Sequence, residues 1–252
     1  MPKSRADWLA ELQPYADEAA RMTGWNFAHL PQPLGAPPPW DYEARARELA
    51  ATAPRLVDLG TGGGELLSRV LAGYPGHAAA TEQWGPNVPV AGRRLAALRT
   101  PVVNADSYLL PFASGTFDLL LDRHEALRPA EVARVLAPGG TALTQQIHPD
   151  WYFELREAFP RMQRWEQHDE TYPRGFAEAG LEIVDYRSHD QLMAYPHLGP
   201  LVYMLVAAPW TVPDFDLAAD LDALLEIDRT LRRPEGLVLT DRRYILEARK
   251  SE

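Results

Sequence analysis

The stretch VDLGTGGGE, residues 57–65, decides the fold of this chain. It predicts a short buried strand that ends in a glycine-rich turn, with a helix beginning at Glu65. Gly60, Gly62 and Gly64 carry no side chains, so a ligand can approach the backbone closely at this turn. The helix that follows offers unpaired N–H groups in its first turn. The stretch therefore predicts a ligand site where strand, turn and helix meet.

Composition restricts the class of protein. The chain has 252 residues, 46% of them hydrophobic, which suits one sizeable α/β core. Its formal net charge is -10 and its basic residues gather only in short doublets, which disfavours a nucleic-acid partner. It has no cysteine, so disulfides, thiolate catalysis and zinc–cysteine sites are excluded. We also expect no metal site.

The first residues and the apolar runs bear on location. The N-terminal stretch lacks the apolar centre of a signal peptide, and no apolar run approaches the length of a membrane span. We therefore expect a cytoplasmic protein with no membrane partner. A monomer or a homodimer is expected, with a small molecule as its substrate.

Strands and helices alternate from Arg55 onward. Strands are expected at residues 56–59, 78–81, 102–104, 117–121 and 141–147, with helices at 65–71, 88–98 and 131–136. Alternation of this kind is typical of βαβ units in a Rossmann-like α/β fold, with helices on both faces of a mostly parallel sheet. Later strands are expected at 182–187 and 237–248, with helices at 151–162, 199–207 and 217–231.

Segments outside these alternating strands and helices are expected to cover the ligand site. Residues 1–40 are expected to form an N-terminal helical lid and a proline-rich arm, and residues 41–252 the main domain. Substrate-covering insertions are expected near 149–176 and 190–215. Their aromatic side chains are candidates for the wall of an apolar pocket. They are Trp8, Tyr15, Trp25, Phe27, Trp40, Trp151, Tyr152, Phe153, Phe159 and those within 195–210.

Acidic residues at the predicted strand ends narrow the ligand class. The dinucleotide fingerprint needs glycine where this chain has Glu65. Asp58, at the end of the first strand, would repel a pyrophosphate and suits a cationic or amine-bearing ligand. Glu82 can accept both hydroxyls of a ribose, and Asp106 can accept an adenine amino group. Trp84 can pack on the edge of a base.

With these residues the chain resembles a class I S-adenosylmethionine-dependent methyltransferase of the type 11-like kind. The similar segments are VDLGTGGGE (57–65), ATEQ (80–83), residues 104–121 and EVARVLAPGGTALTQQ (131–146). The resemblance implies a seven-stranded sheet with a reversed last strand, and residues 237–250 are similar to that strand. It also implies S-adenosylmethionine (SAM) as cofactor and S-adenosylhomocysteine (SAH) as product.

The resemblance assigns roles residue by residue. The three glycines would line the methionine portion of the cofactor, Glu82 would bind the ribose, Asp106 the adenine, and Asp58 would lie near the amino group. Tyr42, on the helix before the first strand, is expected to reach the cofactor. The whole predicted cofactor set is Tyr42, Asp58, Gly60, Gly62, Gly64, Glu82, Gln83, Trp84, Asp106 and Ser107.

Methyl transfer from this cofactor depends little on a catalytic base. The cofactor carries an activated methyl group, so alignment of the acceptor can contribute about 7–11 kcal/mol, and a general base adds about 10²–10⁴-fold in rate. His124, after the fourth strand, and His148, after the fifth, are the predicted catalytic residues. Residues 121–125 lack the N-P-P-[FY] sequence of nucleobase amino-methyltransferases, which argues against such an acceptor.

Methyl transfer to an oxygen, nitrogen or carbon atom of a small molecule is the leading interpretation. An RNA or protein methyltransferase, and a SAM-binding protein without catalysis, remain alternatives. A nicotinamide-binding Rossmann protein is disfavoured by Glu65. A shared fold does not fix a function, and the acceptor stays open.

Overall fold

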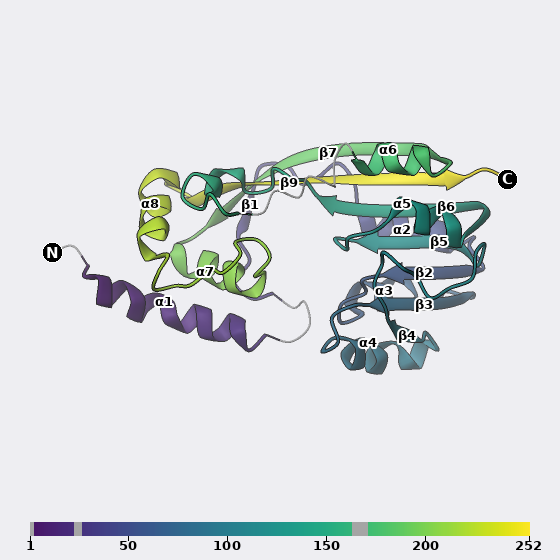
Figure 1. Cartoon of the computed structure of the whole chain (residues 1–252), viewed down its shortest axis with the longest axis horizontal. Helices are drawn as coiled ribbons and strands as arrows, with labels where there is room; N and C mark the ends of the chain where they lie inside the picture. The colour runs from purple at the N-terminus through teal and green to yellow at the C-terminus, as the bar shows by residue number, and fades with distance from the viewer. Residues whose placement is uncertain (1–2, 23–26, 163–170) are drawn as a thin grey trace. The chain divides into compact units, whose positions relative to one another are not determined.

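A computed structural model describes residues 3–22, 27–162 and 171–252 of the chain. It divides into two compact units (Figure 1). The accessory unit comprises Met1–Pro38, Asp150–Trp165 and Asp190–Arg242, and the sheet unit comprises Pro39–Pro149, Glu166–His189 and Arg243–Glu252. Trp25 and part of the insertion expected near 149–176 lie outside the described residues.

Five parallel strands form the centre of the sheet unit. They are β2 (Arg55–Leu59), β3 (His77–Glu82), β4 (Val102–Asn104), β5 (Phe117–Arg123) and β6 (Leu136–Ile147). β2 pairs in parallel with β3 and β5, β3 with β4, and β5 with β6. Their carboxyl ends therefore lie at one edge of the sheet, where open α/β folds bind their ligands. All five predicted strands are present, and β5 and β6 are longer than predicted.

The last strand runs against the others, as the resemblance implied. β9 (Gly236–Lys250) pairs antiparallel with β6, and β7 (Leu181–Tyr195) stands beyond β9 in the strand order β7-β9-β6-β5-β2-β3-β4. Two short strands complete a nine-stranded sheet in the described part of the chain. β1 (Gln32–Leu34) pairs with β7, and β8 (Arg232–Arg233) with β9. The predicted α/β class is confirmed, with β1 and β8 added.

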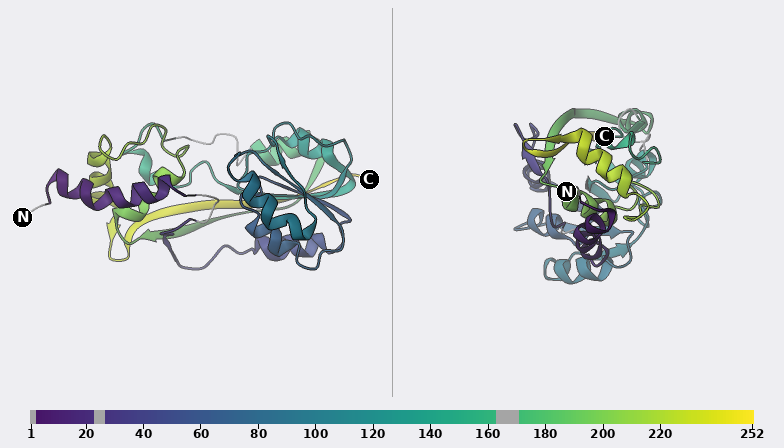
Figure 2. Two further views of the ribbon diagram at one scale, coloured as in Figure 1. Left: turned by 90° about the horizontal axis from the view of Figure 1, so that it is seen from below. Right: turned by 90° about the vertical axis from the view of Figure 1, so that its left-hand side faces the viewer.

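Helices lie on both faces of the sheet (Figure 2), and alternate side chains of the strands pack against them. Leu56 and Leu119 point to the face that is covered by α2 (Tyr42–Ala50), α3 (Glu65–Val70) and α4 (Val88–Leu95). Val57 and Leu120 point to the opposite face, under α5 (Pro129–Val135) and α6 (Thr171–Glu178). Both faces are apolar, as expected for strands that are buried on both sides.

The accessory unit has its own apolar core, built from α1 (Arg5–Ala20), the short 3-10 helix η2 (Phe153–Arg156), α7 (Leu198–Ala207) and α8 (Leu221–Leu231). Ser4 begins α1 with a capping box that includes Asp7. A methyl group added to Gly199 of α7 would overlap the ring of Tyr15, so α1 and α7 pack closely. Among the described residues, no helix is both long and apolar enough to cross a membrane.

Two expectations about the accessory unit differ from the structure. Residues 151–162 form only η2 and turns rather than one helix, because Tyr152 has a left-handed φ of 49° and Pro160 cannot supply a helical N–H. Tyr152 and Phe159, predicted as pocket wall, are buried in the core of this unit. Phe153 is 43% exposed and Trp210 44% exposed. The substrate-covering role of these segments stays a prediction.

Candidate functional site

The glycine loop, residues 60–64, joins β2 to α3. Gly60, Gly62 and Gly64 have φ values of 58°, 62° and 78°, in the left-handed region that favours glycine, and Gly64 is the N-cap of α3. The Thr61 N–H donates to the carbonyl oxygen of Thr81 at 2.9 Å, which fastens the loop to the end of β3. The predicted strand, turn and helix are confirmed, and the loop lies at the carboxyl edge of the sheet.

Glu82 is buried and holds the glycine loop in place. Its Oε2 accepts the Gly62 N–H at 2.6 Å, and its Oε1 accepts the Trp84 N–H at 2.7 Å. Burial raises the pKa of Glu82, and these two backbone hydrogen bonds oppose the rise. Each carboxylate oxygen has a second lone pair, so Glu82 can still accept hydroxyl groups. Its ribose-binding role stays a prediction.

Asp58 and Tyr42 lie near Asp122, at the buried end of β5. Burial raises the pKa of Asp58 to about 7, and the charge of Glu82 adds to the rise. The Tyr42 hydroxyl accepts the Asp122 N–H at 3.1 Å. Burial raises the pKa of Tyr42, and the neighbouring carboxylates Asp58 and Asp122 add to the rise. Tyr42 thus lies near Asp58, and its contact with the cofactor stays a prediction.

Residues after β3 and β4 form an outer rim. Trp84 is 61% exposed, Ser107 is buried, and the Asp106 Oδ1 accepts the Tyr108 N–H at 2.8 Å. The Asn104 side chain donates to the carbonyl oxygens of Glu82 and Gln83, at 2.8 and 3.1 Å. These bonds fix the ends of β3 and β4 beside each other. The predicted base-binding residues therefore occupy neighbouring strand ends.

His124 is the first residue of the β5 loop, residues 124–128, and has a left-handed φ of 68°. Its N–H donates to the Gln145 carbonyl oxygen at 2.8 Å. The Trp40 indole, which can only donate, bonds Gln145 Oε1 at 2.8 Å, so Gln145 Nε2 must donate to His124 Nε2 at 3.0 Å. Burial lowers the pKa of His124 well below its usual value, and Arg243 and Arg123 lower it further. His124 is therefore neutral, with its proton on Nδ1.

His148 lies one residue beyond the end of β6 and is half-buried. That position is at the same edge of the sheet as the glycine loop, because β6 runs parallel to β5 and β5 to β2. The catalytic roles of His124 and His148 stay predictions.

Asp122 was missed by the sequence analysis and is fully buried. Its Oδ1 accepts the Thr144 hydroxyl at 3.2 Å and the Gln146 Nε2 at 2.8 Å, whereas its Oδ2 has no partner in the described structure. Burial raises the pKa of Asp122, and the charge of Glu125 is the next largest cause. The signal in the sequence was a run of polar residues at the end of an apolar strand.

Glu125, in the β5 loop, was missed as well. Burial raises its pKa to about 7, and the charges of Glu82 and Asp106 contribute. Its backbone is fixed, because the Gln146 side chain donates to the Glu125 carbonyl oxygen at 2.8 Å. The β5 loop therefore brings one more carboxylate towards the predicted cofactor residues.

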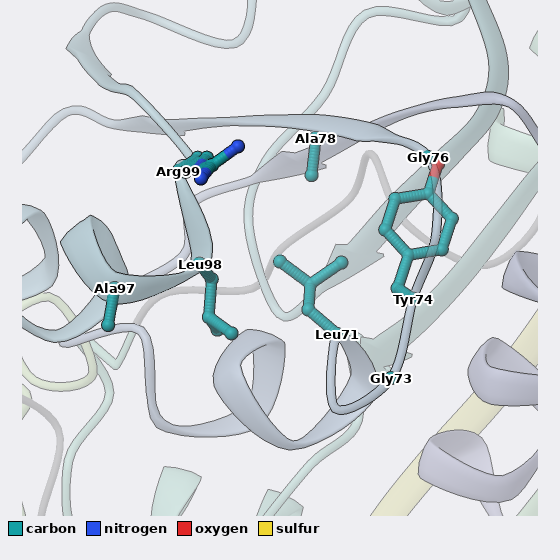
Figure 3. A pocket seen from close by; sticks show the side chains of 8 residues that line it. All are labelled: Leu71, Gly73, Tyr74, Gly76, Ala78, Ala97, Leu98 and Arg99. Carbon is teal, nitrogen blue, oxygen red and sulfur yellow. The ribbon is translucent and has the colours of Figure 1, made fainter.

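A separate pocket of about 240 Å³ lies at the opposite edge of the sheet (Figure 3). Its lining comes from the segment between α3 and β3, the start of β3 and the segment after α4. The lining residues are Leu71, Gly73, Tyr74, Gly76, Ala78, Ala97, Leu98 and Arg99. No predicted site residue lines it. Among the described residues, no group of three or more histidine, aspartate or glutamate side chains is arranged to hold a metal ion.

One known protein is similar to this chain in sequence over about half of its length. No family model matches the chain. The chain is 31% identical over 128 residues to a demethylmenaquinone methyltransferase of Thermus thermophilus, an alignment that covers 46% of this chain and 57% of that protein. The chain therefore spans little more than half the length of this relative.

Solved structures agree on the fold. A functionally unknown protein from Deinococcus radiodurans R1 aligns with a TM-score of 0.62 and 16% identity, covering 94% of this chain and 99% of its own. The [4+2]-cyclase SpnF aligns at 0.53 and 16%, covering 99% and 97%. A geranyl diphosphate methyltransferase in complex with SAM aligns at 0.50 and 18%, covering 83% and 85%. The chain therefore has the fold of the class I SAM-dependent methyltransferases.

Proposed function

We propose that this chain transfers a methyl group from SAM to a small-molecule acceptor. The observation that carries the proposal is the 31% identity with a methyltransferase over 128 residues, and the glycine loop between β2 and α3 supports it. Gly60 and Gly62 have left-handed φ values that favour glycine, and the Glu82 carboxylate ties this loop to the end of β3.

The site suits this cofactor chemically. SAM carries an ammonium group, a sulfonium, a ribose diol and an adenine amine, all of which favour acceptor atoms. Asp58, Glu82 and Asp106 supply carboxylates at three neighbouring strand ends. Asp122 adds a buried carboxylate oxygen, Oδ2, that lacks a donor among the described residues. A dinucleotide would instead bring its anionic pyrophosphate against Asp58.

When bound, SAM supplies an activated methyl group. The task of the chain is to align the acceptor and exclude water, which can account for about 7–11 kcal/mol of the barrier. We propose His124 and His148 as the groups that can take a proton from the acceptor. For His124 this requires its Nε2 to exchange the hydrogen bond from Gln145 for one to the acceptor.

Two observations support a small-molecule acceptor: the net charge of the chain and the name of its relative from Thermus thermophilus. A net charge of -10 opposes binding to a phosphate backbone. The relative from Thermus thermophilus acts, by its name, on demethylmenaquinone, a small molecule. A SAM-binding protein without methyl transfer is the second candidate, because a shared fold does not fix a function, and SpnF, which has this fold, is named a [4+2]-cyclase.

Calorimetric titration with SAM, with NAD as control, tests the proposal. Micromolar binding of SAM without binding of NAD supports it, and labelled-methyl transfer to a panel of small molecules then separates an enzyme from a binding protein. Binding of NAD alone, or of neither ligand, would contradict it. Retention on heparin would favour RNA as the acceptor.

A further inference from the structure

The Glu125 side chain covers the first glycine of the glycine loop. A methyl group added to Gly60 would lie 2.5 Å from the Glu125 Cβ and 2.6 Å from its Oε2 carboxylate oxygen. Gly60 belongs to the loop that is assigned above to SAM. The Glu125 carboxylate therefore lies directly against this loop.

The backbone on both sides of this side chain is held by polar contacts. Gln146 Nε2 donates to Asp122 Oδ1 and to the Glu125 carbonyl oxygen, both at 2.8 Å. Two residues further along, the Leu127 N–H donates to the Tyr172 hydroxyl at 3.0 Å. Within residues 3–22, 27–162 and 171–252, the Glu125 carboxylate itself has no hydrogen bond and no ion pair. The loop is fixed while its carboxylate is left available.

The negative charges around Glu125 favour binding of a cation. Glu82 and Asp106 raise its pKa by repulsion, and Glu125 in turn raises the pKa of Asp122. The Asp122 Oδ2 is buried without a partner in the described structure. Asp58 is near enough to Asp122 to raise its pKa too, and Arg123 is the cation that acts on Asp58. None of the described acidic groups here forms a metal-binding arrangement, which favours an organic cation.

We propose that Glu125 binds the positively charged end of SAM and lets the site distinguish SAM from SAH. This inference rests on the proposed function. SAM carries a sulfonium and SAH a neutral thioether, and the two are otherwise alike. A carboxylate beside this part of the ligand attracts the sulfonium and gains little from the thioether. Glu125 then favours binding of the methyl donor and release of the product.

The test is calorimetric titration of the wild type and the Glu125→Gln variant with SAM and with SAH. Glutamine keeps the size of the side chain and removes its charge. The expected result is SAM affinity about tenfold weaker, with SAH affinity changed less than about twofold. Glu125→Asp, which keeps the charge, should retain part of the preference for SAM. Glu178→Gln, on an exposed part of α6, is the matched control and should bind both ligands as the wild type does.

The outcomes separate the two proposals. A wild type that binds neither SAM nor SAH contradicts the proposed function, and this inference with it. A wild type that binds both, with an unchanged ratio of affinities in Glu125→Gln, overturns the role of Glu125 alone. Equal weakening of both ligands also overturns it, since that pattern assigns Glu125 to loop structure rather than to charge.

Discussion

The glycine loop and the β5 loop meet at one edge of the sheet and are held in opposite ways. In the glycine loop, a carboxylate from the neighbouring strand, Glu82, accepts a backbone N–H of the loop. In the β5 loop, the amide of Gln146 holds the backbone, and the Glu125 carboxylate is left without a partner in the described structure. The first loop uses a charge to fix its shape. The second is held by the Gln146 amide and the Tyr172 hydroxyl, and we propose that its carboxylate binds the ligand.

The largest expected effect comes from filling the space between the loops. Gly60→Ala forces alanine into a left-handed φ of 58° and pushes a methyl group into Glu125. Strain and overlap together should weaken SAM binding by about 100-fold or more. Gly92→Ala is the control, because nothing lies within 4 Å of a methyl group at this position in α4. Calorimetry measures both, and an unchanged affinity in Gly60→Ala would show that the ligand does not use this loop.

The next largest effect concerns turnover. His124→Asn keeps a residue that tolerates left-handed φ and removes the imidazole. If His124 acts as the base, turnover should fall by about 10²-fold or more while SAM affinity stays within about twofold. Steady-state kinetics and calorimetry together provide the measurement. If SAM affinity falls together with turnover, the imidazole of His124 stabilises the β5 loop instead of acting as the base.

Removal of the charge that shapes the glycine loop should have a smaller effect. Glu82→Ala leaves the N–H groups of Gly62 and Trp84 without their acceptor. SAM affinity should fall about tenfold, and the melting temperature should fall as well. Thermal unfolding with and without SAM measures both, with Glu178→Gln as the control. Equal melting temperatures and affinities in Glu82→Ala and the wild type would contradict the role of Glu82 in either.

The smallest effect is a pH dependence. Asp58 and Glu125 have pKa values raised to about 7, so the folded protein keeps protons that the unfolded chain releases. Their contribution to the stability of the ligand-free protein should therefore fall as the pH rises from about 4 to 7. SAM affinity should rise severalfold between pH 6 and 8, as both groups ionise. Glu125→Gln should show a flatter rise, and an equally steep one would exclude Glu125 as its source.

The two loops also differ in how well they could be predicted. The glycine loop was predicted because its signal is local: an apolar strand, three spaced glycines and a helix start. Two partners of the β5 loop, Gln145 and Gln146, lie about twenty residues further along the chain, on β6. Their contact depends on the register between β5 and β6, which the sequence does not display.

The accessory unit shows the same limit. Its long helices were predicted from apolar spacing, whereas β1 was not, because Pro33 lies at its centre. β1 is the outermost strand of the order, and proline is tolerated on edge strands since a missing N–H costs no pairing on the open side.

The hydrogen bonds from Trp40 to Gln145 and on to His124 run in one direction, because the indole can only donate. The imidazole at the end of this series stays unprotonated across the physiological range. A rise in turnover near neutrality, which is usually assigned to a histidine, therefore does not come from His124. Asp58 and Glu125, whose pKa values are raised to about 7, can produce such a rise.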